Sequence, residues 1–272
     1  MIGVRLNGRL GNQMFQYALA YSLERKYHCH FIIDNDFKED AVKKYFKTSP
    51  LVNNKYPRKL FMKFIAPRLS MVTQNNGEPT GAILPLLGDQ KFYYGFFQSE
   101  LYFTNISREL QKYFQVKPEF TKAFSHKYGH LFSKKVLAIH YRLGDYLSWG
   151  SKEMGGVDMS LPESFYLDAL KQITDLQDYI IILVTDDAQN AAHKLPALIN
   201  KIIISDTEIM DLQLLMNADK LIVSNSSFAW WGAYLNKKNA AVFAPEYWLG
   251  FKVGRELPNA VIPGLFTKIK VY

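Results

Sequence analysis

The sequence predicts an α/β protein of two halves, each built on a parallel sheet, which face one another across a cleft. Short segments rich in Ile and Val alternate with helical stretches, and continuous apolar strands of this kind are typical of a parallel sheet covered on both faces. A polar stretch at 118–135 separates the halves, so we expect domains at 1–125 and 126–272. The cleft between two such halves is the expected ligand site.

The first half opens with a strand and then a helix. Residues 2–6 have the pattern of a strand, and the helix over 12–27 has one face of mainly apolar residues. That face comprises Phe15, Ala18, Leu19, Ser22 and Leu23. The elements expected next are a strand at 30–34, a helix at 36–46, a loop at 73–81, and a strand followed by a helix within 92–114.

The second half has the clearer pattern. Strands are expected at 136–140, 179–184, 201–205, 220–224 and 240–245. Helices are expected between and after them, at 163–175, 187–194, 208–217 and 227–236. This regular alternation predicts a doubly covered parallel sheet.

Composition excludes several classes of protein. Hydrophobic residues make up 48% of the 272-residue chain and charged residues 21%, as in a globular protein with a substantial core. Cys29 is the single cysteine, so neither an internal disulfide nor a multi-cysteine zinc site is expected. No signal peptide and no apolar run of spanning length are recognisable, so we expect a cytoplasmic protein. The net charge of +8 predicts an anionic partner such as a nucleotide, a nucleic acid or a membrane surface.

Unusual polar residues follow three strands of the second half. "HYRLGDY" at 140–146 follows the first of them, "TDD" at 185–187 follows the second, and "SNSSFAWWG" at 224–232 follows the strand at 220–224. Ligands of open parallel sheets bind beyond the carboxyl ends of the strands. The three segments are therefore expected to meet at one rim.

The first of these segments offers a phosphate ligand. Arg142 presents a planar fork of donors that suits phosphate oxygens, although a surface ion pair with Asp145 is the simpler alternative. His140 could donate a hydrogen bond to a phosphate, a ribose or a base, or could be a structural residue.

The segment at 224–232 predicts an anion site. Serine side chains at 224–227 are expected to cap a helix whose first N–H groups suit a diphosphate, and an ordinary N-cap is the alternative. Trp230 and Trp231 are expected to pack against the sheet rather than to bind sugar.

Two pairs of acidic residues have alternative interpretations. Asp186 or Asp187 could accept the two adjacent donors of guanine, or could cap a helix. The D-x-D pattern of Asp34 and Asp36 matches some metal-dependent sugar transferases, but the end of a strand and a helix cap explain it more simply.

Together the motifs resemble those of the bacterial α-1,2-fucosyltransferases of glycosyltransferase family 11. "GRLGNQMFQYALA", "FYYGFFQSELYF", "HYRLGDY", "VTDD" and "SNSSFAWWGAYL" occur in the order and spacing of that family, over residues 3 to about 247. The resemblance implies a GT-B type fold with two Rossmann-like domains. It also implies metal-independent, inverting transfer of fucose from GDP-fucose to a galactose hydroxyl, as in the synthesis of bacterial O-antigens or capsules. GDP-fucose is a donor substrate, and no cofactor is expected.

The resemblance also assigns roles to residues. Arg142 would hold the β-phosphate, and His140 with Asp186 or Asp187 would contact the nucleoside. Ser226, Ser227 and Phe228 would present the helix start to the diphosphate. Gly11, Asn12 and Gln13 would lie near the fucose and the acceptor, with Gly8 and Gly11 leaving room for the backbone to approach the donor. Asp145 is the first candidate for a general base, while Asn12 could orient the incoming hydroxyl.

One residue departs from the family pattern. Where the family has a second arginine after Arg142, this chain has Leu143. The missing cation is expected to alter either the choice of acceptor or part of the contact with the phosphate. Arg142 itself is retained.

Other functions compete with this interpretation. The chain could use another nucleotide sugar or form another linkage, or it could be a sugar-binding protein that has lost catalysis. A nucleic-acid binder is disfavoured, because no arginine-rich stripe, RNA-binding aromatic signature or zinc-finger spacing occurs.

A basic and apolar segment at 55–71 suggests a membrane contact. It places Lys55, Arg58, Lys59, Lys63 and Arg68 beside Leu60, Phe61, Phe64 and Ile65. Such a segment could lie on the anionic inner face of the cytoplasmic membrane, where a lipid-linked glycan acceptor would be available. A solvated helix that covers the first domain is the alternative.

Overall fold

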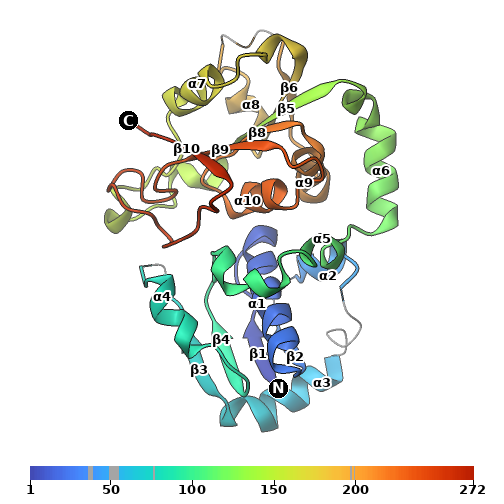
Figure 1. Ribbon diagram of the computed structural model, residues 1–272, viewed down its shortest axis with the longest axis vertical. Coiled ribbons are helices and arrows are strands. Elements are labelled where there is room, and N and C mark those ends of the chain that lie inside the picture. Colours follow the sequence, from blue (N-terminus) through green and yellow to red (C-terminus); the bar gives the residue numbers. More distant parts are fainter. Residues whose placement is uncertain (36–38, 49–54, 76, 197, 199) are drawn as a thin grey trace. The chain divides into compact units, whose positions relative to one another are not determined.

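The chain folds into two units, each with its own parallel sheet (Figure 1). The computed structural model describes residues 1–35, 39–48, 55–75, 77–196, 198 and 200–272. The first unit comprises Met1–Lys117 with Pro258–Val261, and the second comprises Pro118–Leu257 with Ile262–Tyr272. The boundary thus lies after Lys117, before the expected position at residue 125.

The first unit contains a four-stranded parallel sheet. Its strand order is β2-β1-β4-β3, and Gly3 at the centre pairs with Ile32 on one side and Phe92 on the other. The strands are short: β1 and β2 are mostly buried, as their apolar residues predict, whereas three of the four residues of β3 are exposed. They are β1 (Ile2–Arg5), β2 (Phe31–Asp34), β3 (Ser70–Thr73) and β4 (Lys91–Tyr94).

Helix α1 (Leu10–Tyr27) dominates the helical part of this unit. Its residues from Met14 to Ala20 are all buried, and Ser22 Oγ donates to Tyr102 O at 3.0 Å. The other helical elements are short: α2 (Ala41–Tyr45), α3 (Lys55–Leu60), the π-helix η2 (Phe61–Ile65), α4 (Thr80–Ile83), α5 (Leu110–Tyr113), and the 3-10 helices η3 (Ala66–Arg68), η4 (Leu84–Leu86), η5 (Glu100–Tyr102) and η6 (Thr104–Ile106).

Two helix predictions in this unit were wrong in extent. The helix expected at 36–46 is only Ala41–Tyr45, with residues 36–38 outside the described ranges. The helix expected before residue 114 is divided into two 3-10 turns and α5, in which aromatic residues such as Tyr102 and Phe114 are buried.

The second unit contains a six-stranded parallel sheet of order β10-β9-β8-β5-β6-β7. All five strands predicted for this half are present, and the sixth, β10, was not predicted. The strands are β5 (Lys135–Tyr141), β6 (Tyr179–Thr185), β7 (Ile202–Ile204), β8 (Lys220–Ile222), β9 (Ala241–Pro245) and β10 (Phe266–Ile269).

The helices of this unit include the four that the pattern predicted, of which α7 and α8 are shorter than expected, and one that it missed. The missed helix, α6, occupies the polar stretch expected as a boundary, with Phe124 buried and Phe120 O accepting from Gln213 Nε2 at 3.4 Å. The elements are α6 (Pro118–Tyr128), α7 (Glu163–Lys171), α8 (Ala188–Ala191), α9 (Glu208–Asn217), α10 (Ser227–Tyr234), and the 3-10 helices η7 (Gly129–Ser133), η8 (Gly144–Leu147), η9 (Lys152–Met154) and η10 (Leu176–Asp178).

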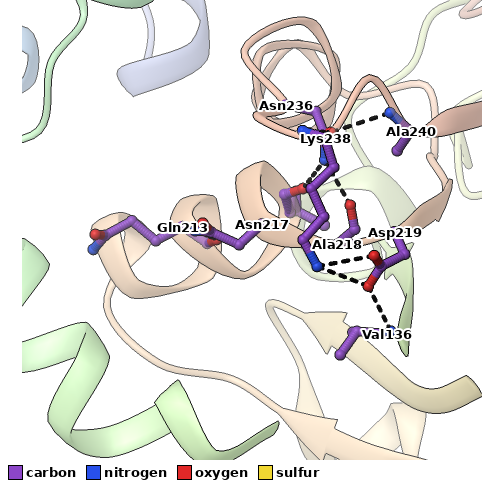
Figure 2. Close-up of polar contacts among 9 residues, drawn as sticks. Val136, Gln213, Asn217, Ala218, Asp219, Asn236, Lys238 and Ala240 are labelled. Atoms are coloured by element: carbon purple, nitrogen blue, oxygen red, sulfur yellow. Dashed lines mark hydrogen bonds and ion pairs between the residues drawn. The ribbon is translucent and has the colours of Figure 1, made fainter. Parts of the chain in front are cut away.

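A polar network fixes the carboxyl ends of α9 and α10 (Figure 2). The buried amide of Asn236 donates through Nδ2 to Leu215 O at 3.1 Å and to Ala218 O at 2.9 Å, while its Oδ1 accepts from the Lys238 N–H at 2.8 Å. Lys238 Nζ lies 2.9 Å from both carboxylate oxygens of Asp219. The Asn236 side chain thus links the loop after α10 to the end of α9 and helps to hold α10 in position.

Candidate functional site

The three polar segments of the second unit meet at one edge of the sheet. Strands β8, β5 and β6 are adjacent and parallel, so their carboxyl ends lie together. His140 Nδ1 lies 2.8 Å from Ser224 Oγ, and the Leu143 N–H donates to Asp186 Oδ1 at 2.9 Å. These contacts join the first segment to each of the others and confirm the expected rim.

Arg142 extends from the end of β5 into this rim. Its Nη2 lies 2.6 Å from Asp145 Oδ1, and its Nη1 lies 3.2 Å from Asp186 Oδ2. The guanidinium carbon also lies 5.2 Å from the centre of the Tyr146 ring. Only 12% of the side chain is exposed, and its buried Nε–H has no hydrogen-bond partner in the described part of the chain. Arg142 does pair with Asp145, but as a largely buried group rather than as a surface ion pair.

His140 is neutral in this site. Burial and the neighbouring Arg142 charge lower the pKa of the imidazole to about 3. Its ring lies 5.7 Å from that of Phe228. The positive character of the rim therefore comes from Arg142 and from the start of α10, while His140 offers only neutral hydrogen bonds.

Helix α10 begins at the rim without a side-chain cap. Ser226 is the N-cap residue, but its side chain makes no capping hydrogen bond, so the expectation of a serine cap was wrong. Ser227 and Phe228 are partly exposed at the first turn. Backbone N–H groups of that turn are therefore left for another acceptor. Trp230 and Trp231 are fully buried, as predicted.

Asp186 and Asp187 are both engaged within the second unit. Asp186 binds the Leu143 N–H and Arg142, while Asp187 caps α8 by accepting from the Asn190 N–H at 3.0 Å. Hydrogen bonds from Asn190 lower the pKa of Asp187. Gly144 has a φ of +28°, and a Cβ there would lie 2.2 Å from Asp186 Oδ2. A glycine is therefore needed where the two loops touch.

Leu143 presents no charged or polar side chain to the rim. It is 4% exposed and belongs to the hydrophobic core of the second unit. At the position where the family resemblance led us to expect a second arginine, this chain thus has a core residue whose backbone N–H holds Asp186.

The predicted residues of the first unit lie at the start of α1. Gly8 has a φ of +75°, and a Cβ there would lie 2.3 Å from Asn12 Nδ2, so this glycine makes room for Asn12. Gly11 and Asn12 are in the first turn of α1, and Asn12 Oδ1 accepts from Gln98 Nε2 at 2.6 Å. Gln13 is buried, donating to Glu39 O and accepting from the Ala41 N–H, and these bonds fix α1 to the segment before α2.

The D-x-D pattern is only partly described. Asp34 is fully buried and pairs with Arg5 at 2.9 Å and Arg58 at 2.6 Å, whereas Asp36 lies outside the described residues. Those pairs give Asp34 a structural role. Within the described ranges, no group of three or more His, Cys, Asp or Glu residues could hold a metal ion.

Sequence reasoning missed an aromatic feature beside Arg142. Trp149 stacks on Tyr146 with ring centres 5.7 Å apart, and 45% of Trp149 is exposed. Asn225 fastens this loop, because its backbone O accepts from Tyr146 Oη at 3.1 Å and its Nδ2 donates to Met159 O at 3.0 Å. Tyr146 was within a recognised motif, but Trp149 lies in an irregular loop with no periodic signal.

A buried carboxyl group was also missed. Asp211, in the first turn of α9, accepts from the Asp206 N–H at 3.2 and 3.3 Å. Burial raises its pKa to about 7, and the charges of Asp206 and Asp186 add to the shift. It was not recognised because its position matches the apolar face of a helix.

Comparisons with known proteins agree with the motifs. The sequence model described as "Glycosyl transferase family 11" matches residues 1–252. The alpha-1,2-colitosyltransferase of Escherichia coli is 25% identical over 282 residues, which cover 91% of this chain and 92% of the relative. The O-antigen biosynthesis glycosyltransferase WbnK of Escherichia coli is 24% identical over 286 residues, with 89% and 93% covered.

A solved structure shows the same fold. The NodZ alpha-1,6-fucosyltransferase of Bradyrhizobium, in crystals soaked with GDP-fucose, superposes with a TM-score of 0.53 at 12% identity, covering 86% of this chain and 92% of that one. With the two parallel sheets, this likeness confirms the expected α/β architecture of GT-B type. In the described part of this chain, no helix has the length and apolar character needed to cross a membrane.

Proposed function

This chain belongs to glycosyltransferase family 11, and on that premise we propose that it transfers fucose from GDP-fucose to O2 of a galactose-type acceptor. The reaction inverts the anomeric carbon and needs no metal ion. Similarity to an O-antigen biosynthesis glycosyltransferase supports a bacterial surface glycan as the acceptor. The fold shared with a fucosyltransferase that was soaked with GDP-fucose supports the donor.

The observation that carries this proposal is the buried Arg142 at the end of β5. Its guanidinium is oriented by Asp145 and Asp186, and its Nε–H has no hydrogen-bond partner among the described residues. When the bond between fucose and GDP breaks, negative charge grows on the β-phosphate. A preoriented cation stabilises that charge, and removing one such group costs about 3 kcal/mol in comparable sites.

The start of α10 supplies the second part of the diphosphate site. Ser226, Ser227 and Phe228 carry the first N–H groups of a helix without a side-chain cap, and the helix dipole adds partial positive charge there. Together with Arg142 these groups replace the charge that a divalent ion would provide. His140 adds neutral hydrogen bonding, and it contacts the nucleoside next to Phe228.

The remaining assignments are made by family resemblance and by position. We assign Asp145 as the general base, since 42% of its side chain is exposed and the Arg142 charge keeps it oriented. Asn12 orients the incoming hydroxyl, with Gly11 and Gln13 shaping the turn around it. Asp186 and Asp187 act on the nucleoside through the loops that they hold.

Trp149 fits the acceptor rather than the donor. An exposed indole next to a phosphate-binding arginine offers an apolar face on which a galactose ring can stack. The stack Trp149–Tyr146–Arg142 is continuous, so a sugar on the indole is close to the departing diphosphate.

A second candidate donor is GDP-colitose, favoured by the similarity to an alpha-1,2-colitosyltransferase. Colitose is fucose without the 3-hydroxyl, so both sugars place the same diphosphate on the same groups. The enzyme can therefore distinguish GDP-fucose from GDP-colitose only through hydrogen bonds to the 3-hydroxyl of fucose.

A donor and acceptor panel tests the proposal. The protein is incubated with GDP-fucose, GDP-colitose, GDP-mannose or UDP-galactose and galactose-ended glycans, with and without EDTA, and the product linkage is determined by NMR. We expect transfer from GDP-fucose to O2 that EDTA leaves unchanged. Transfer from another donor only, or complete loss in EDTA, would contradict the proposal.

A further inference from the structure

The positive charge of the chain is concentrated in one segment. Residues 41–77 contain eight of the 33 Lys and Arg residues and none of the 25 Asp and Glu residues. The other 25 basic residues balance the 25 acidic ones, so this segment accounts for the whole net charge of +8. Such a local excess in the first unit indicates an anionic partner at that surface.

Part of this segment is held firmly against the first sheet. Arg58 Nη2 forms a 2.6 Å ion pair with the buried Asp34 at the end of β2. The Phe61 ring is 2% exposed and lies 6.5 Å from that of Phe92, beside Gly3 of β1. Figure 1 shows the stretch from α3 to β3 passing beside the start of β1. Residues 58 and 61 therefore fix which side of the segment faces solvent.

The opposite side combines apolar and basic groups. Leu60 is 59% exposed and Phe64 is 51% exposed, four residues apart. Lys59 and Lys63 are exposed at the same spacing, and Lys63 Nζ lies 5.1 Å from the centre of the Phe64 ring. We call these four residues the basic-apolar face. Farther along, Arg68 is exposed and Met71 is 67% exposed, so the same character continues into β3.

We propose that the basic-apolar face binds an anionic lipid bilayer. Two large apolar side chains held outward by buried anchors can enter the boundary between headgroups and acyl chains, while the flanking lysines pair with lipid phosphates. A nucleic acid or an acidic polysaccharide would use the lysines but leave Leu60 and Phe64 in water. The face is a docking surface only and takes no part in the transfer chemistry.

Vesicle flotation of the 272-residue protein tests this assignment. We expect association with phosphatidylcholine vesicles that contain phosphatidylglycerol, little association with phosphatidylcholine alone, and release at high salt. The pair K59Q/K63Q and the pair L60Q/F64Q are each expected to reduce partitioning about tenfold. Both pairs should keep the circular dichroism, the Tm and the transfer rate on a water-soluble acceptor.

Matched controls lie in the second unit. K122Q/K134Q removes two exposed lysines, and V157Q/L265Q removes two exposed apolar side chains. Both control pairs should bind vesicles like the unmodified protein. The proposal is overturned by no association with anionic vesicles at low salt, or by equal losses in the control pairs. It is also overturned if L60Q/F64Q binds normally, or if DNA binds this face as tightly as the vesicles do. Because transfer to a water-soluble acceptor is measured separately, failure here is distinguishable from failure of the proposed function.

Discussion

Asp186 holds the backbone of Leu143 through a 2.9 Å hydrogen bond from the Leu143 N–H to Asp186 Oδ1. The other carboxylate oxygen lies 3.2 Å from Arg142 Nη1. The loop after β5 is therefore tied to the loop after β6 both by its backbone and by charge. Arg142 has a defined direction before any ligand binds, which is the preorganisation that electrostatic stabilisation of a leaving group requires.

Arg142→Ala is expected to lower kcat for GDP-fucose by about a hundredfold, because the loss of one preoriented donor costs about 3 kcal/mol. Arg142→Lys keeps the charge but not the planar fork, and an intermediate loss is expected. Turnover at saturating donor is measured together with the Tm. Arg255→Ala, which removes an exposed arginine, is the control and should leave kcat unchanged. Near-normal turnover in a folded Arg142→Ala variant would remove this residue from the mechanism.

Gly144→Ala is expected to displace Asp186. The added Cβ would lie 2.2 Å from Asp186 Oδ2, and the φ of +28° is itself unfavourable for alanine. Misplacement of Arg142 follows, with an expected loss of about ten- to a hundredfold in kcat/KM for the donor. Gly264→Ala is the matched control, since no atom lies within 4 Å of a Cβ there. Equal kinetics in the two variants would show that the Gly144 contact does not orient the site.

His140 is expected to make the protein sensitive to acid. Its pKa is about 3 in the folded protein and 6.5 in a model peptide, so the unfolded chain binds a proton that the folded chain does not. Stability from this group is complete above pH 6.5 and is lost as the pH falls toward 3, at up to about 1.4 kcal/mol per pH unit. In urea unfolding, the free energy of unfolding of the unmodified protein should therefore fall more steeply below pH 6.5 than that of His140→Gln.

The control for that experiment is His126→Gln, which removes an exposed histidine and should follow the unmodified protein at every pH. If the free energies of unfolding of His140→Gln and of the unmodified protein fall in parallel below pH 6.5, His140 is not buried in its neutral form.

Asp211 is expected to act in the opposite direction. Its pKa is raised from 3.8 to about 7, so the unfolded chain loses this proton at a lower pH than the folded chain. Stability from this group is present below pH 3.8 and is lost as the pH rises to about 7. Asp211→Asn keeps an acceptor for the Asp206 N–H and should gain Tm relative to the unmodified protein over that range. Asp168→Asn, at a partly exposed carboxylate, should show no such gain.

Trp149→Ala is expected to raise the KM for the galactose-type acceptor about tenfold, because the sugar loses its stacking surface. The KM for GDP-fucose should stay unchanged, since the indole stacks on Tyr146 and it is the Tyr146 ring that lies against Arg142. Trp149→Phe should retain most of the affinity, and Leu147→Ala, a neighbouring exposed residue, serves as the control. A change in donor KM alone would assign the indole to the nucleotide instead.

Much of the fold followed from local patterns. The apolar runs at 179–184 and 201–205 form strands because a parallel sheet accommodates them, with Leu183, Val184 and Ile204 buried. The motifs around Arg142, Asp186 and Ser226 were predictable as one rim because parallel topology brings the carboxyl ends of strands to one edge.

The role of each polar group depended on contacts between residues far apart in the chain. Asp186 is 43 residues from Leu143, and no local pattern indicates that its carboxylate binds that backbone. The neutral state of His140 results from burial beside Arg142. A glycine is required at position 8 because the Asn12 side chain occupies the space that a Cβ would need.

Local patterns were thus sufficient to predict the α/β architecture, the family and the strand ends that carry the chemistry, because periodicity and motif spacing are local properties. Long-range contacts were needed to show that β10 joins the second sheet, that residues 258–261 pack with the first unit, and that Asp145 and Asp186 orient Arg142. Pairing, burial and ionisation depend on neighbours that the order of residues does not specify.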